Sequence, residues 1–206
     1  CALIVADMWT VDKRFCNDSY FQPKKDVYRA FKIQPYEEEL LKDESHFRVL
    51  NLATNTFNEA RTSYYLKSIG GYSAAKLRRY QDLIDVHIAP EMNPLMQAIM
   101  QTNGFMLPCN GDSIFPVLNM LNMKYAIVPL QNGSQMPVQN PYAMGNCWFV
   151  DSLMVVDNAN DEIVALSQID LHTTAVVDKS FAEVLRTSSN SHLKGETGRV
   201  SLTQYT

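Results

Sequence analysis

The stretch Ser73-Ala-Ala-Lys-Leu-Arg-Arg-Tyr-Gln-Asp-Leu-Ile-Asp-Val-His-Ile88 decides the fold class, because it has the pattern of a helix lying between two strand-like runs. Its apolar side chains recur at helical spacing and leave the opposite face charged; they are Leu77, Tyr80, Ile84 and Ile88. The flanking runs, Phe47-Arg-Val-Leu-Asn-Leu52 and Lys124-Tyr-Ala-Ile-Val-Pro129, are typical of core strands. Strands that alternate with helices predict an α/β or α+β domain with one mixed β-sheet flanked by helices.

Further elements extend this pattern in both directions. Pro and Asn at favourable N-terminal positions predict helices over residues 35–42, from Asn93-Pro94 to Gly104, near Ser113, and over residues 158–166. Apolar runs predict strands over residues 2–7, 146–156, 173–177 and 199–205. The polar loop 131–140 predicts that strands 124–129 and 146–156 are antiparallel neighbours.

Composition narrows the class of protein. The chain has 206 residues, of which 46% are hydrophobic and 19% charged, so a single domain over residues 1–206 can bury a core of its own. A net charge of -4 has the wrong sign for a dedicated nucleic-acid binder. No apolar run approaches the roughly 20 residues of a membrane-spanning helix. Because the chain starts at Cys1 within an apolar run and ends on a strand-like run, we expect a fragment of a longer protein.

Motifs for common enzyme and metal sites are absent from the sequence. The four cysteines form no Cys-x-x-Cys pair, and the four histidines lack the spacing of a zinc hydrolase. There is no Gly-x-Ser-x-Gly turn, no Gly-rich phosphate loop and no dinucleotide-binding turn. We therefore predict no catalytic residue, metal or cofactor, and an independent hydrolase is the least favoured hypothesis.

One polar segment is a candidate binding site for an anion or a sugar. A Gly-Gly turn that leads into a helix would present free backbone N–H groups to an anion, with cationic side chains close by. Tyrosine rings would offer flat faces for a sugar ring. The candidate residues are Tyr64, Tyr65, Gly70, Gly71, Tyr72, Lys76, Arg78 and Arg79. The alternative is a solvated helix face beside a tight turn.

Residues 89–147 contain few charged side chains. Their only charged side chains are Glu91, Asp112 and Lys124, although eight of the ten Met and seven of the nine Pro lie there. One interpretation is that these residues form core, with Met filling irregular gaps. The other is an adaptable surface that meets a membrane or another domain.

The polar segment also carries a family resemblance. The run Thr62-Ser-Tyr-Tyr-Leu-Lys-Ser-Ile-Gly-Gly-Tyr-Ser-Ala-Ala-Lys-Leu-Arg-Arg-Tyr-Gln-Asp-Leu-Ile84 resembles the YfhO-like bacterial membrane protein family. Further stretches resemble the same family in the same order: Asp12-Lys-Arg14, Phe47-Arg-Val-Leu-Asn-Leu52, Val117-Leu-Asn-Met-Leu-Asn-Met-Lys-Tyr125, Gly145-Asn-Cys-Trp-Phe-Val150 and Thr174-Ala-Val-Val-Asp178. The resemblance covers nearly the whole chain.

The resemblance implies a function that the residues alone do not. Members look like large polytopic membrane proteins similar to glycosyltransferases that use lipid-linked sugars, and this chain would be a non-catalytic portion on the extracytoplasmic, periplasmic side of a bacterial membrane. Its partners would be the transmembrane portion of the same chain and a polyprenyl-phosphate sugar or glycan. The alternative is a structural scaffold that packs on the transmembrane part or on a β-rich part.

Overall fold

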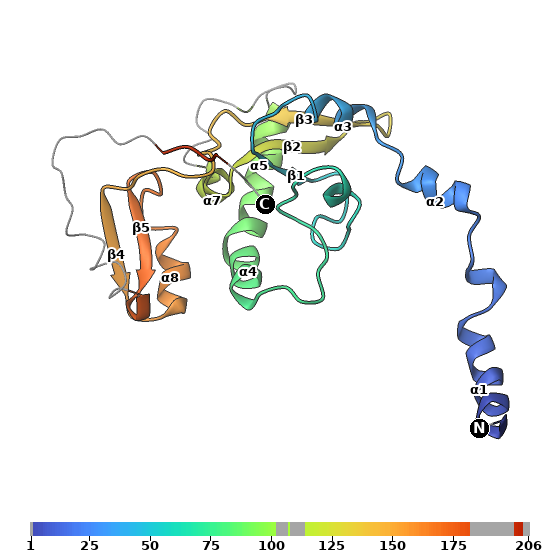
Figure 1. Cartoon of the computed structure of the whole chain (residues 1–206). Coiled ribbons are helices and arrows are strands. Elements are labelled where there is room, and N and C mark those ends of the chain that lie inside the picture. The colour runs from blue at the N-terminus through green and yellow to red at the C-terminus, as the bar shows by residue number, and fades with distance from the viewer. Residues whose placement is uncertain (1, 102–106, 108–113, 182–199, 204–206) are drawn as a thin grey trace. The chain divides into compact units, whose positions relative to one another are not determined.

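The computed structural model describes residues 2–101, 107, 114–181 and 200–203. The chain divides into two compact units, Cys1–Pro35 and Tyr36–Thr206. Figure 1 labels their helices and strands along the chain. All the strands of the described residues belong to the second unit.

The first unit is helical, where a strand was expected over residues 2–7. It contains α1 (Ala2–Phe15), a 3-10 turn η1 (Asp18–Tyr20) and α2 (Lys24–Ala30). The prediction was wrong because a run of five apolar residues is too short to show its period. Over the longer window the apolar residues follow helical spacing; they are Ile4, Met8, Val11 and Phe15.

The second unit is built around a mixed three-stranded sheet in the order β1-β2-β3. Strand β1 (Arg48–Asn51) pairs in parallel with β2 (Met123–Pro129), and β3 (Gln135–Gln139) pairs antiparallel with β2. The sheet occupies the middle of this unit, because alternate residues face opposite clusters of buried side chains. Leu50, Ala126 and Val128 face one cluster, and Val49 and Ile127 face the other.

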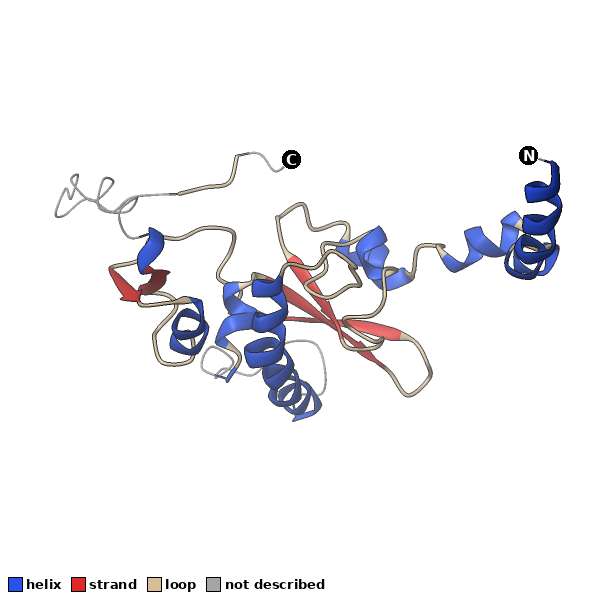
Figure 2. Cartoon of the chain, turned by 90° about the horizontal axis from the view of Figure 1, so that it is seen from below, coloured by secondary structure: helices blue, strands red, loops and turns tan. Residues whose placement is uncertain are grey.

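A long helical segment covers the first face of the sheet (Figures 1 and 2). It consists of α4 (Arg78–Leu83), the π-helical turn η3 (Ile84–Ile88) and α5 (Ala89–Gln101). Its buried residues in this core are Ile84, Ile88, Leu95, Ala98 and Ile99, and the short helix α7 (Pro116–Met120) adds Val117 and Leu118. On the second face, α3 (Pro35–Leu40) contributes Tyr36 and Leu40, and Leu66 follows the 3-10 turn η2 (Thr62–Tyr64).

The helix boundaries differ from those expected. The helix begins at Arg78 rather than Ser73 and does not restart at Asn93-Pro94, because Pro94 lies inside α5. Pro90 has no N–H to donate to Val86, and just before it Ala89 donates its N–H to Ile84 in a π-type bond. Burial of one face of the helix outweighs these lost hydrogen bonds. Gly104 and Ser113 lie outside the described residues.

A second sheet contains β4 (Ser152–Val156) and β5 (Thr174–Asp178), which are parallel and joined by α8 (Ala159–Ala165). The expected antiparallel pairing of strands 124–129 and 146–156 is wrong. The antiparallel partner of β2 is β3, which lies within residues 131–140, where a loop was expected. The strand was not predicted because Pro137 and the polar Gln135 obscure its alternation of polar and apolar residues. The strand expected over residues 199–205 lies partly outside the described residues, and residues 200–203 form no strand.

The fold class is confirmed. Mixed and parallel strand pairs, connected and covered by helices, make the second unit an α/β or α+β structure. A buried ion pair holds α3 to the second face of the sheet: both carboxylate oxygens of Glu37 accept hydrogen bonds from Arg61, at 2.5 and 2.8 Å. The Glu37 side chain is fully buried, so this pair fixes the position of α3.

Candidate functional site

The Gly70-Gly71 turn does not have the geometry expected of an anion site. Gly70 donates its N–H to the Ser68 hydroxyl at 3.1 Å, and Gly71 donates its N–H to the Thr56 carbonyl at 2.7 Å. The N–H of Tyr72 is also bonded, to the carbonyl of Glu59 at 2.9 Å. The helix starts only at Arg78, so its N-terminus and the glycine turn do not coincide.

The three cationic side chains of the candidate site have contacts within the protein. Arg78 pairs with Asp82, one helical turn further on, at 2.9 Å, and Arg79 pairs with Glu162 of α8 at 2.9 Å. The Nζ of Lys76 lies 5.7 Å from the centre of the Phe57 ring. An anion would therefore compete with these carboxylates for both arginines.

The tyrosines of the candidate site divide into two groups. Tyr64 and Tyr65 contact each other edge to face, with ring centres 5.0 Å apart, and the guanidinium of Arg61 lies 5.1 Å from the centre of the Tyr65 ring. Tyr64 and Tyr72 are each 64% exposed. The structure thus joins Tyr65 to the Glu37–Arg61 pair, and it places two tyrosine rings at the surface.

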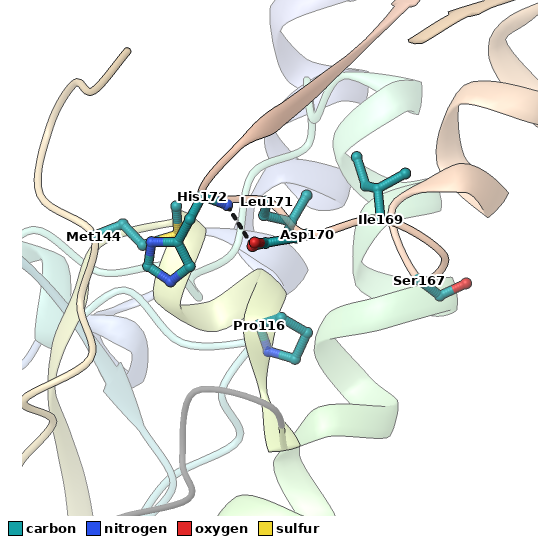
Figure 3. A pocket seen from close by; sticks show the side chains of 7 residues that line it. All are labelled: Pro116, Met144, Ser167, Ile169, Asp170, Leu171 and His172. Carbon is teal, nitrogen blue, oxygen red and sulfur yellow. Dashed lines mark hydrogen bonds between the residues drawn. The ribbon is translucent and has the colours of Figure 1, made fainter. Parts of the chain in front are cut away.

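A cavity with a volume of about 570 Å³ lies elsewhere in the second unit (Figure 3). Its lining residues are Pro116, Met144, Ser167, Ile169, Asp170, Leu171 and His172. Next to it, the indole N–H of Trp148 donates to the Leu171 carbonyl at 3.1 Å, which fixes the backbone of this wall. The lining combines four apolar residues with three polar ones, as small-molecule sites commonly do.

The polar residues of this cavity do not form a nucleophile–base pair. Asp170 accepts the backbone N–H of His172 at 2.9 Å, and Figure 3 shows this bond. The Ser167 hydroxyl donates to the Val164 carbonyl at 2.8 Å and lies at the opposite end of the cavity from His172. Ser, His and Asp therefore share this cavity without the geometry of a catalytic triad.

The described residues of the charge-poor segment 89–147 contribute many side chains to the core. Leu95, Ile99, Val117 and Val138 are buried, and Met92, Met96, Met120, Met136 and Met144 are partly buried against the same cluster. Glu91 is also buried, and it accepts backbone N–H bonds from Val117 at 3.0 Å and Leu118 at 2.9 Å, at the start of α7. Burial raises the pKa of Glu91 to about 7, although the two hydrogen bonds oppose this shift.

Asp43, in the loop before β1, has a pKa that is shifted in the opposite direction to that of Glu91. Burial alone would raise the pKa of Asp43, but hydrogen bonds from Lys124, Ser45 and Tyr125 hold it well below its usual range. Lys124 also lies 5.7 Å from the centre of the Phe47 ring. Each described charged residue of the segment 89–147 therefore makes a specific contact that stabilises the fold.

The first unit exposes many large apolar side chains, a feature that the sequence analysis did not identify. None of its described side chains is buried, and its exposed large apolar residues are Leu3, Ile4, Val5, Met8, Trp9, Val11, Phe15, Tyr20, Phe21, Val27, Tyr28 and Phe31. Residues 1–35 carry six Lys and Arg against four Asp and Glu, so they are basic in an otherwise acidic protein. The helical spacing of residues 4–15 was the signal that could have revealed this surface.

Within the residues described, no helix has both the length and the apolarity needed to span a bilayer. The same residues contain no group of three His, Cys, Asp or Glu side chains placed to hold a metal ion. Cys16 and Cys147 are exposed free thiols, and Cys1 and Cys109 lie outside the described residues. Comparison with protein-family models, curated proteins and solved structures finds no match to this chain.

Proposed function

We propose that this chain is a non-catalytic, membrane-bound domain, in which the first unit binds the bilayer surface and the second unit is a folded α/β module. One observation carries the proposal: the first unit exposes a dense set of large apolar side chains in a basic segment. Leu3 is 87% exposed, Trp9 62% and Phe15 72%. A soluble surface rarely exposes such a patch unless it meets another apolar phase.

The order of residues in the first unit suits a lipid interface. The first turn of α1 is apolar on all sides, Trp9 follows, and the helix ends with Lys13 and Arg14. Lys13 lies over the Trp9 ring at 5.9 Å, and Lys24 lies over the Tyr28 ring at 5.7 Å. Aromatic rings and basic side chains are enriched at the level of lipid headgroups, because each has an apolar body and a polar end.

The resemblance to the YfhO-like family completes the proposal. On that basis, the membrane is a bacterial cell membrane, the domain lies on its periplasmic side, and the transmembrane partner belongs to the same protein. The wider role would be to assist recognition of a lipid-linked sugar or cell-envelope acceptor. Because Arg78 and Arg79 are paired within the fold, the exposed rings of Tyr64 and Tyr72 are better candidates for a sugar contact than the glycine turn.

Vesicle binding tests the membrane contact. The purified chain should co-sediment with phosphatidylglycerol vesicles more strongly than with phosphatidylcholine vesicles, and the emission of Trp9 should shift to shorter wavelength. The signal of Trp9 is obtained by subtracting the spectrum of a Trp9→Phe variant, which leaves Trp148 as the other tryptophan.

A matched pair of variants separates the apolar stripe from simple charge effects. Met8→Glu places a carboxylate in the stripe of residues 4–15 and should weaken binding at least tenfold. Thr10→Glu makes the same change in charge on the polar side of α1, next to Asp7, and should weaken binding much less. Equal effects of the two changes, or a chain that stays in the supernatant with both lipids, would show that the first unit does not bind a bilayer in this way.

A further inference from the structure

The segment from β4 to β5 is a βαβ unit with an unusually small sheet. The sheet contains only these two strands among the described residues, and the two are parallel (Figure 1). Parallel sheets are normally larger and covered on both faces, and a two-stranded sheet by itself is marginal in water. Strand β4 therefore has an edge that the described part of the chain leaves unpaired.

The backbone of β4 shows which groups point to this edge. Ser152 donates its N–H to the Thr173 carbonyl at 3.0 Å, as its alignment with Thr174 requires. Because hydrogen-bonding direction alternates along a strand, the N–H and C=O groups of Leu153 and Val155 point away from β5. An added strand would bond to these four groups without disturbing the pairing of β4 with β5.

The side chains of β4 are apolar on both faces of the sheet. Leu153 is 49% exposed, Met154 39% and Val155 54%. Exposed edge strands usually carry a Lys, a Pro or a bulge that prevents pairing with other chains, and residues 152–156 have none of these. An added strand would cover apolar surface on both sides of β4.

Charges at the ends of β4 indicate the kind of strand that fits. Asp151 precedes the strand and Asp157 follows it, and both are exposed. Asp157 pairs with Lys179 at 3.0 Å, but both side chains are exposed, so this pair contributes little. A second copy paired antiparallel about Met154 would place Asp151 opposite Asp157 of that copy, which is unfavourable. The complementary partner therefore has a cation at each end.

We propose that the open edge of β4 is a docking site for an extended polypeptide segment that has an apolar centre and a Lys or Arg at each end. The segment adds to the sheet as a third strand, with backbone bonds to Leu153 and Val155 and ion pairs to Asp151 and Asp157. Such strand addition obtains its affinity from backbone bonds and its specificity from the side chains. The residues of this docking site differ from those of the bilayer contact in the first unit. An experiment can therefore refute one of the two proposals without refuting the other.

Titration of the whole ¹⁵N-labelled chain with the synthetic peptide Lys-Val-Thr-Val-Thr-Val-Lys tests the proposal. The amide signals of β4 should shift most, and the amides of Leu153 and Val155 should become protected from hydrogen exchange. A peptide with Glu at both ends should bind at least tenfold more weakly, and Asp151→Asn with Asp157→Asn should reduce that difference. Added salt should weaken the Lys peptide more than the Glu peptide.

Two controls separate strand addition from unspecific apolar contact. Val155→Pro removes an outward N–H that β5 does not use, and it should weaken binding at least threefold, whereas Val155→Thr keeps the N–H and should bind nearly normally. Methylation of alternate peptide nitrogens should abolish binding without any change to the protein. The proposal is overturned if the Lys peptide does not bind, if the methylated peptide binds equally well, or if the shifts lie outside β4.

Discussion

Replacing Glu91 by Gln should remove a large part of the pH dependence of folding stability. Glu91 is 9% exposed, and its two carboxylate oxygens accept the N–H groups of Val117 and Leu118. These are N–H groups of the first turn of α7, which have no acceptor within the helix. Gln keeps one acceptor oxygen but turns an NH₂ group toward the second N–H, which should cost about 1 kcal/mol at acidic pH.

The sign of the pH effect follows from the direction of the pKa shift. Burial raises the pKa of Glu91 from 4.5 to about 7, so the folded protein holds a proton that the unfolded chain releases. The stabilisation by this proton is complete below pH 4.5 and is lost as the pH rises through 7. A shift of this size corresponds to about 3 kcal/mol. The Gln variant has no proton to lose at this position.

Urea unfolding of both proteins between pH 5 and pH 8 measures this difference. The free energy of unfolding of the wild type should fall relative to that of Glu91→Gln across this range by roughly 2 to 3 kcal/mol, because a part of the full effect is already lost at pH 5. All other titrating groups are common to the two proteins, so their contributions cancel in the difference. If the two pH profiles are parallel, Glu91 is ionised in the folded protein over the whole range, and the argument from burial is wrong.

Two further predictions concern the second unit, and thermal unfolding tests both. Glu37→Gln should destabilise the protein by about 3 kcal/mol, because it leaves the Arg61 guanidinium without its buried carboxylate partner. An unchanged melting temperature would mean that water solvates the guanidinium as well as the carboxylate does. Gly70→Ala should destabilise by about 2 kcal/mol because its Cβ would lie 2.1 Å from the Thr56 carbonyl oxygen. Gly133→Ala, which has a φ of +79° but no atom within 4 Å of the new Cβ, should cost only about 1 kcal/mol, and equal losses would contradict the steric argument.

The elements that the sequence predicted well are those with a strong local signal. Asn158 caps α8 by accepting the N–H groups of Asn160 and Asp161, and this pattern is visible in the sequence. The alternating apolar residues of β1, β2 and β5 also match the structure. Strand β3 was missed because Pro137 and the flanking glutamines resemble a loop, and only its pairing with β2 makes it a strand.

Whether the residues of the candidate site can bind an anion depends on long-range contacts, which the local sequence does not show. The ion pair of Arg79 with Glu162 joins α4 to α8, far apart in the chain, so the sequence analysis took Arg79 as available to a ligand. The N–H of Gly71 is likewise consumed by Thr56, through the backbone path that brings residues 67–69 alongside β1. A glycine turn and nearby cations predict an anion site only when the helix starts at the turn.

A low content of charged residues and the exposure of apolar side chains indicate different environments in this protein. The charge-poor segment contains Glu91 and Lys124, and both hold buried or partly buried contacts, as expected for core residues that cannot reach water freely. The first unit, in contrast, has a normal density of charge, yet its apolar side chains remain exposed beside its lysines. A core segment avoids charge because water is excluded, whereas an interfacial segment needs charge beside its apolar residues because it contacts both phases. The surface that meets a membrane should therefore be sought in residues 3–32 of the first unit rather than in the Met-rich residues 89–147.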